Sequence, residues 1–243
     1  MTKKEIKKIL KIRKLTNFSF FLCKESLKIN NWDIKKSINY LRIKEGNKNI
    51  NLNNLKFGIA YSYLNKSKTL GHIIELKVNN KEVANNKKLL KILKKIIKIS
   101  ILNKCKKIND LYKLKFSKNK DIYTLLLDYS IMFKDSIKIN KFKILKTNYI
   151  YNYNHYNNQI ASLIGYKIKI NNFKKLKKII KYISLDLISN FLNKKKEIKK
   201  INNYYKSDKI DPLLLKRIGI NKVRYLYYLN KYINIYDYYI IYI

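Results

Sequence analysis

Few residues of this chain have types and spacings that could do covalent or metal chemistry. Cys23 and Cys105 do not form a CxxC pair, and His72 and His155 complete no Cys–His cluster. No phosphate-binding GxxxxGKS/T loop, HExxH helix or GxSxG elbow occurs, and the 15 acidic residues are scattered. The sequence therefore predicts no enzyme active site, no cofactor and no metal site. We expect the two cysteines to be buried free thiols in a reducing compartment.

One stretch, Ile73–Asn86, is patterned to present polar side chains at a defined place. Its apolar residues alternate up to Val78, as in a strand, and a polar corner from Asn79 to Glu82 follows. Val83 then leads into a lysine-rich helical segment. A strand that delivers a short exposed turn to the start of a helix can bind a partner, but many ordinary loops have the same form. The pattern alone leaves both interpretations open.

The formal net charge is +41, from 56 basic and 15 acidic residues. A charge of this size usually indicates nucleic acid or an acidic membrane as a partner. However, only four of the basic residues are arginines, and the guanidinium fork is the usual phosphate ligand. The lysines are spread evenly and accompany many Ile, Asn and Tyr residues, which indicates codon bias of an AT-rich genome. We still expect weak, salt-sensitive, nonspecific RNA binding and fast association with an acidic partner.

The helices and strands predicted around the corner indicate an α+β fold. Ser19 and Asp33 stand where they would cap the second and third of three short helices, a ubiquitin-associated-like bundle. From Phe57 the apolar residues alternate, so we expect a hairpin and then a helix over 57–101. Alternating segments between 136 and 170, before a long helix at 173–192, predict a second unit built as a meander and a helix. The expected architecture is an N-terminal three-helix bundle followed by two antiparallel sheet-plus-helix subdomains.

These elements also predict domain boundaries. The expected divisions are a three-helix partner-binding module at 1–46, a linker at 47–56, a core N-subdomain at 57–132, and a core C-subdomain with a short C-terminal extension at 133–243. Smaller expectations are a helix plus a lysine-rich loop at 102–120, a charged connector at 193–208, a short helix near 222–230, and a terminal strand at 236–243. Because the terminal strand is apolar on both faces, we expect it inside a sheet rather than at an edge.

No stretch approaches the ~18–20 uncharged apolar residues that a membrane span requires, so no membrane partner is expected. The first twelve residues are charged and helical, with no secretion signal visible. We expect a cytoplasmic protein from a reduced, AT-rich bacterial genome, with an organelle matrix as the alternative.

The N-terminal residues resemble the helical module of the elongation factor Ts family. That module has a leucine-containing helix, a short corner, then Met-Met-Asp-Cys-Lys-Lys-Ala-Leu, Gly-Asp-Ile-Glu, and a third helix ending in Leu-Arg. In this chain the corresponding stretches are Phe20–Leu27 (FFLCKESL), Trp32–Lys35 (WDIK) and Leu41-Arg42. The cysteine, the lysine after it, the leucine and the Asp-Ile pair are shared.

Two further stretches extend the resemblance to about residue 190. The family's Glu-Val-Asn-Cys-Glu-Thr-Asp-Phe-Val-Ala-x-Asn is similar to residues 75–86, but its Thr-Asp-Phe is replaced by Asn80-Lys81-Glu82. The family's Ile-Gly-Glu-Asn-Ile is similar to 133–137 (FKDSI), and its Ser-Tyr-x-His to 152–155 (NYNH). The family's long inserted coiled coil is missing here, since only residues 193–208 separate the predicted helix at 173–192 from Pro212.

The resemblance implies a guanine nucleotide exchange factor of translation elongation, not an enzyme of covalent chemistry. It would bind GDP-bound elongation factor Tu, disturb the magnesium and phosphate site, and promote GDP release and GTP reloading. By position, the residues that would disturb the magnesium site are Asn80, Lys81, Glu82 and Val83. The other implied partner contacts are Lys24, Phe133, Lys134 and His155. The change from Asp-Phe to Lys81-Glu82 implies retained binding with reduced exchange efficiency. The composition keeps one alternative open, a basic RNA-binding or ribosomal protein.

Overall fold

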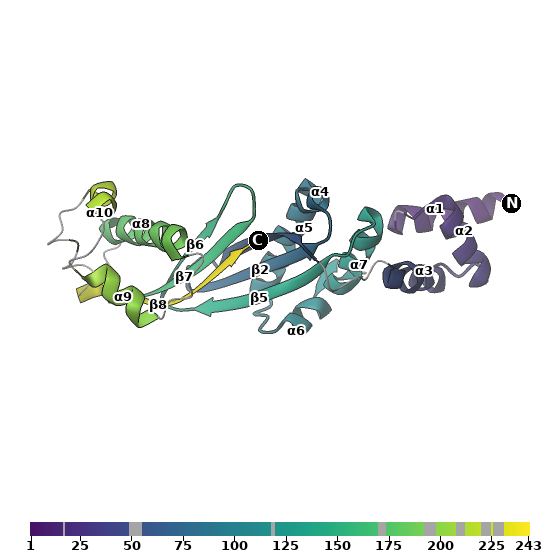
Figure 1. Cartoon of the computed structure of the whole chain (residues 1–243). Helices are drawn as coiled ribbons and strands as arrows, with labels where there is room; N and C mark the ends of the chain where they lie inside the picture. The colour runs from purple at the N-terminus through teal and green to yellow at the C-terminus, as the bar shows by residue number, and fades with distance from the viewer. Residues whose placement is uncertain are drawn as a thin grey trace. The chain divides into compact units, whose positions relative to one another are not determined.

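The computed structural model describes residues 1–16, 18–48, 55–117, 120–169, 174–191, 198–207, 212–219, 225 and 231–243. Three N-terminal helices are followed by antiparallel sheets and helices, which confirms the predicted α+β class (Figure 1). The helices are α1 Lys3–Thr16, α2 Phe20–Ile29, α3 Ile34–Lys48, α4 Lys81–Ala84, α5 Lys87–Leu102, α6 Ile108–Lys113, α7 Ile122–Phe133, α8 Lys174–Phe191, α9 Ile198–Lys206 and α10 Pro212–Ile218. The strands are β1 Phe57–Leu64, β2 Leu70–Val78, β3 Lys115–Ser117, β4 Lys120–Asp121, β5 Lys138–Lys146, β6 Tyr149–Asn154, β7 Ile160–Ile168 and β8 Ile233–Tyr242.

The chain divides into two compact units, each made of three stretches. Unit 1 comprises Met1–Gly58, Leu76–Ile92 and Lys107–Asn140. Unit 2 comprises Ile59–Glu75, Leu93–Lys106 and Lys141–Ile243.

In unit 1 the three predicted N-terminal helices are confirmed, and so are two of their caps. The Ser19 hydroxyl accepts a hydrogen bond from the Leu22 backbone N–H at 3.3 Å, and the Asp33 carboxylate accepts one from Lys36 at 2.9 Å. Each cap satisfies a donor that the first helical turn leaves unpaired. The helices pack around a small apolar core of Ile9, Ile12, Phe18, Cys23, Leu27, Leu41 and Ile131.

The last member of that core, Ile131, belongs to α7, so the bundle packs on α7 within the unit. An ion pair fixes this contact. The Arg42 guanidinium on α3 donates to both oxygens of Asp128 on α7, at 2.8 and 3.0 Å, and the Lys120 ammonium bonds the same carboxylate. The Asp128 side chain is only 8% exposed, so its charge depends on these two cations. The bidentate geometry also fixes the orientation of α3 on α7.

The three strands predicted as one meander are divided between two sheets. β5 lies in the sheet with order β1-β2-β5, whereas β6 and β7 belong to the sheet β6-β7-β8. At the start of β6 and just before it, backbone N–H groups bond to the β1–β2 turn. Thr147 donates to the Thr69 carbonyl at 3.0 Å, and Ile150 donates to the Lys68 carbonyl at 2.8 Å. The hairpin predicted from Phe57 onward is confirmed as β1 and β2.

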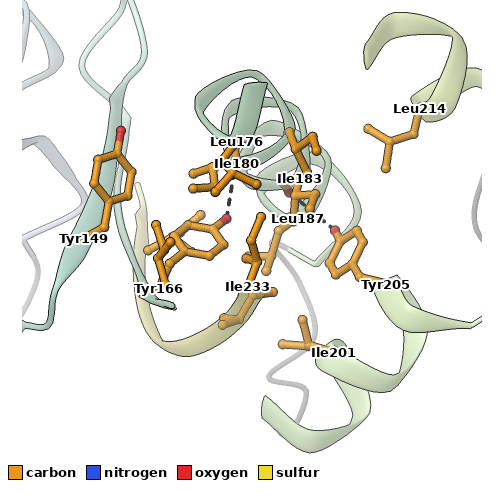
Figure 2. Packing of buried hydrophobic residues seen from close by; sticks show 14 of the residues in the cluster. Tyr149, Tyr166, Leu176, Ile180, Ile183, Leu187, Ile201, Tyr205, Leu214 and Ile233 are labelled. Atoms are coloured by element: carbon orange, nitrogen blue, oxygen red, sulfur yellow. Dashed lines mark hydrogen bonds between the residues drawn. The ribbon is translucent and has the colours of Figure 1, made fainter. Parts of the chain in front are cut away.

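In unit 2, helices α8, α9 and α10 contribute to one large apolar cluster with the β6-β7-β8 sheet (Figure 2). Tyr166 from β7 and Tyr205 from α9 are almost fully buried in it. Their hydroxyls reach the Ile180 and Ile183 carbonyls of α8 at 3.5 and 3.4 Å (Figure 2). Burial raises the pKa of both phenols, so both stay neutral hydrogen-bonding groups.

The expectation that the terminal strand lies inside a sheet is wrong, because β8 is an edge strand that pairs with β7. The strand is apolar on both faces because each face packs in a different apolar cluster. Ile233 and Ile235 contribute to the cluster with α8, while Ile241 contributes to a second cluster that includes Ile73 of β2. Part of the open edge is also capped, since the Asn202 amide exchanges two hydrogen bonds with the Ile235 backbone at 2.9 and 3.0 Å.

The connecting segments differ from expectation in two places. The helix expected within 102–120 is present as α6, but the short strands β3 and β4 follow it where a lysine-rich loop was expected. The expected connector at 193–208 contains α9. The linker residues 49–54 and most of the helix expected near 222–230 lie outside the described residues. None of the described helices is long and apolar enough to cross a membrane.

His72 on β2 is buried without a charged partner in unit 2. Its Nδ1 lies 2.8 Å from the Ser100 hydroxyl, and its ring meets Phe142 edge to face at 5.3 Å. Burial lowers the pKa of the imidazole to about 4, because the charged form would lose its hydration. His72 is therefore a neutral packing residue at physiological pH.

This depressed pKa predicts a loss of stability in mild acid. In the unfolded chain the pKa is about 6.5, so between pH 6.5 and 4 the unfolded state binds more protons than the folded state. The His72 contribution is complete above pH 6.5 and decreases as the pH falls, by about 2 kcal/mol at pH 5. Urea unfolding at pH 7.5 and pH 5 should show a smaller acid-induced loss for His72→Gln than for wild type. Equal losses would contradict this account.

Candidate partner-binding surface

The polar corner of the sequence is an exposed turn at the end of β2. The Asn80 side chain caps the short helix α4 by accepting a hydrogen bond from the Glu82 backbone N–H at 2.8 Å. Asn80, Lys81 and Glu82 are exposed, whereas Val83 is only 7% exposed. Val83 thus anchors the corner in the interior of unit 1, and the three residues before it offer their side chains to solvent.

A buried carboxylate holds the backbone of this corner. Asp135 is 5% exposed, and its two oxygens accept hydrogen bonds from the backbone N–H groups of Asn79, at 3.0 and 3.2 Å, and Asn80, at 2.9 Å. Hydrogen bonds to a charged acceptor are stronger than neutral ones. The carboxylate also satisfies two N–H groups that would otherwise be left unpaired where β2 ends.

Asp135 stands directly after the end of α7, where the chain makes a tight reversal. Lys134 has φ 51° and ψ 39°, a left-handed conformation that costs a residue with a Cβ about 1 kcal/mol relative to glycine. The Lys134 and Asp135 N–H groups bond back to the carbonyls of Ile131 and Ser130, at 3.2 and 3.0 Å. This reversal turns the Asp135 carboxylate toward the corner and leaves Lys134 exposed.

The structure therefore brings together two groups of residues that the sequence placed about fifty positions apart. The exposed corner, Asn80 to Glu82, and the segment Phe133-Lys134 are joined through Asp135 within unit 1. Phe133 is half-buried and packs against the Tyr129 ring at 5.9 Å. We name residues 79–83 and 133–135 the Asp135-linked surface.

The two remaining residues implied as contacts lie elsewhere. Lys24 is half-buried on α2, in the same bundle as Phe21, whose side chain is 72% exposed. His155 follows β6 in unit 2, where its backbone N–H donates to the Ile160 carbonyl at 2.8 Å. Its ring lies against the strongly exposed Tyr156 ring, with centroids 4.4 Å apart. Both side chains, Lys24 and His155, are half-buried.

Possible metal ligands and thiols also occur among the described residues. Within them, no group of three or more His, Cys, Asp or Glu side chains could hold a metal ion. Cys23 and Cys105 are buried and form no disulfide, as predicted, and burial raises the pKa of the Cys23 thiol. A buried thiol with a raised pKa is a poor nucleophile, so Cys23 fits a core role.

Sequence reasoning named the neighbours of Asp135 but not Asp135 itself. The available signal was an acidic residue immediately after a helix end, at the position of the glutamate in the family's Ile-Gly-Glu-Asn-Ile. Its partners are backbone N–H groups 55 and 56 residues away. Because almost every residue type has a backbone N–H, the sequence does not show which of them Asp135 binds.

Comparison with known proteins identifies the family. A family model described as Elongation factor TS matches residues 82–190. A curated protein named elongation factor Ts, from Wigglesworthia glossinidia brevipalpis, is 32% identical over 194 residues, which cover 76% of this chain and 68% of that protein. The chain belongs to the elongation factor Ts family.

A second member of the elongation factor Ts family, from Buchnera aphidicola subsp. Cinara cedri (strain Cc), is 28% identical over 206 residues. These cover 78% of this chain and 71% of that protein. Membership makes the chain a translation elongation factor. The matched range 82–190 includes Glu82, Phe133, Lys134, Asp135 and His155, so both the Asp135-linked surface and the β6–β7 hairpin fall within or at the edge of the family region.

We predict that Asp135→Asn destabilises this elongation factor Ts family member. One carboxylate oxygen becomes an amide that donates, so it faces the Asn79 or Asn80 N–H without accepting from it. The expected loss is about 1–3 kcal/mol, measured by urea unfolding. The exposed α6 residue Asp110 supplies the control, since Asp110→Asn removes the same charge and should change stability by less than ~0.5 kcal/mol.

Hydrogen exchange gives a local readout of the same change. The Asn79 and Asn80 amides should exchange faster in Asp135→Asn and remain unchanged in Asp110→Asn. Equal stability and equal exchange at these two amides in all three proteins would contradict the assigned role of Asp135.

Proposed function

We propose that this protein is the guanine nucleotide exchange factor of its cognate elongation factor Tu. It binds the GDP-bound partner, disturbs the magnesium and phosphate site, and promotes GDP release and GTP reloading without covalent chemistry. Family membership supports the class of function, and the Asp135-linked surface is the observation that carries the mechanism.

The mechanism follows from the way magnesium holds a nucleotide. The ion bridges phosphate oxygens and protein, so loosening its site removes much of the charge neutralisation that retains GDP. A surface that binds the partner more tightly when the site is disturbed lowers nucleotide affinity, and nucleotide binding lowers the affinity of the factor by the same free energy. No group on the factor needs to be reactive in this mechanism.

The structural reason to assign this role to the corner is rigidity. Asn80, Lys81 and Glu82 are exposed on a turn whose backbone is held by a buried carboxylate and whose last residue, Val83, is anchored inside. A turn ordered before binding loses little further conformational entropy on contact, so more of its interaction energy is available to disturb the partner. Phe133 and Lys134 extend the same surface.

The other contacts divide between the two units. Residues 1–46 act as a partner-binding module through Lys24, with 47–56 as a linker. The core subdomains at 57–132 and 133–243 contribute the corner and, through His155, a second contact. Because the corner carries Lys81-Glu82 and no aromatic side chain, we expect binding to be retained and exchange to be less efficient than with Asp-Phe.

The setting of this activity follows from the charge and the relatives. We propose the cytoplasm of a bacterium as the compartment, since both relatives are bacterial. A net charge of +41 speeds association with an acidic partner and adds weak RNA binding at low salt.

Release of fluorescent GDP from the cognate elongation factor Tu tests the proposal. At ~0.3 M salt the wild-type chain should accelerate release, because a packed protein interface survives a salt concentration that weakens phosphate contacts steeply. The variant Lys81→Ala/Glu82→Ala should still bind the partner in a pull-down but accelerate release about tenfold less, equivalent to ~1.4 kcal/mol. Lys113→Ala/Asp110→Ala on α6 removes one lysine and one carboxylate, both exposed, and should match wild type.

Two outcomes would overturn the proposal at different levels. No acceleration by wild type, together with RNA capture that disappears at ~0.3 M salt, would favour a basic RNA-binding protein instead. Acceleration that is equal in wild type and in the corner variant would keep the exchange function but remove the corner from its mechanism.

A further inference from the structure

The tip of the β6–β7 hairpin holds His155 in one backbone position. The His155 N–H donates to the Ile160 carbonyl at 2.8 Å, and the His155 carbonyl accepts from the Asn158 N–H at 2.9 Å. Asn158 has φ 58°, the left-handed conformation that asparagine tolerates better than most residues. The Gln159 N–H bonds to the Asn157 side chain at 3.0 Å, so the turn is closed by its own polar groups.

The side chain of His155 is held as well as its backbone. The Tyr153 hydroxyl lies 2.6 Å from Nδ1 of the imidazole. Tyr153 stands two residues earlier along the chain, and residues two apart in a strand point to the same face. The Tyr156 ring packs on the other part of the imidazole, with centroids 4.4 Å apart. Among the described residues, the second imidazole nitrogen, Nε2, has no hydrogen-bond partner.

The two nitrogens of a neutral imidazole have opposite roles, and the bond made by one decides the role of the other. A phenol is a far stronger acid than a neutral imidazole N–H, so the favoured arrangement at 2.6 Å has the Tyr153 O–H donating to Nδ1. The proton of the imidazole is then on Nε2. His155 thus has a donor at the nitrogen left available for another molecule.

We propose that Tyr153 is a positioning residue that fixes the tautomer of His155 and makes Nε2–H a hydrogen-bond donor to the partner. The chemistry that fits this donor is an acceptor oxygen, a main-chain carbonyl or a carboxylate. An N–H group on the partner, which can only donate, would face the imidazole Nε2–H without a hydrogen bond. The inference rests on the proposed function for the identity of the partner, but the tautomer belongs to the free chain.

Nitrogen NMR of the free, full-length chain tests the tautomer directly. The chain has two histidines, so the His72→Gln variant leaves one imidazole to observe. At pH 8, His155 should show an unprotonated Nδ1 and a protonated Nε2. Tyr153→Phe removes the hydroxyl but keeps the ring, and it should convert these two signals to a mixture of both tautomers. Tyr156→Phe removes the hydroxyl that does not contact the imidazole and should leave the spectrum unchanged.

GDP release and partner binding supply the second readout. Tyr153→Phe should weaken binding to GDP-bound elongation factor Tu by about five- to tenfold, as expected for one imprecisely placed hydrogen bond. Tyr242→Phe, which removes an exposed hydroxyl from β8 in the same unit, is the matched control and should bind as wild type does.

Each result decides a separate claim. A protonated Nδ1 in wild type, or an unchanged spectrum in Tyr153→Phe, would overturn the tautomer assignment. The expected spectra with unchanged binding by Tyr153→Phe would overturn the positioning role. A wild-type chain that does not accelerate GDP release would instead contradict the proposed function. The NMR result would still decide which imidazole nitrogen carries the proton.

Discussion

The buried carboxylate of Asp135 is the interaction on which the candidate surface depends. A strand must end somewhere, and where β2 ends its backbone N–H groups lose their partners in the sheet. The Asn79 and Asn80 N–H groups bond to Asp135, a residue that the left-handed turn after α7 brings to them. Because the Asp135 carboxylate is buried, it depends on these hydrogen bonds as much as the corner does. A buried carboxylate without hydrogen-bond donors would be unfavourable, so Asp135 and the corner backbone stabilise one another's conformation.

The same logic of mutual satisfaction fixes the N-terminal bundle in unit 1. Asp128 on α7 is nearly buried and is neutralised by Arg42 and Lys120, so α3 has one orientation that keeps all three groups paired. Buried ion pairs add little net stability, but breaking one is strongly unfavourable. α7 thus has two structural roles. Its surface packs against the three-helix bundle, and its C-terminal end positions Phe133, Lys134 and Asp135.

Local patterns predicted the elements well. The caps at Ser19 and Asp33, the hairpin of β1 and β2, and helices α5 and α8 follow from periodicity and capping, which depend on residues close in sequence. The sheet membership of β5 and the edge position of β8 did not follow. A pattern that is apolar on both faces predicts two packed faces, and β8 has them, but burial of the faces says nothing about pairing of the edges.

The candidate site was predictable only by resemblance. The positions of Asn80 to Val83, Phe133, Lys134 and His155 came from matching motifs, and no property of these residues alone marks them as functional. Two residues that the geometry adds, Asp135 and Tyr153, act on neighbours rather than on a partner. Asp135 acts through backbone groups far away in the sequence, and Tyr153 through a side-chain contact that alternation in a strand permits but does not require. The chain is so rich in lysine, asparagine and tyrosine that residue type alone does not distinguish the residues of the candidate site from the rest.

A double-mutant cycle on GDP release tests the central claim most directly. The claim is that Asp135 acts on exchange by holding the corner. GDP release would be measured for wild type, Asp135→Asn, Lys81→Ala/Glu82→Ala and the combined variant, all under conditions where each is folded. If the claim holds, the combined variant is about as slow as the slower of the two parents, giving a coupling energy of about 1 kcal/mol or more. Losses that simply add would contradict it, because the carboxylate and the corner would then act independently.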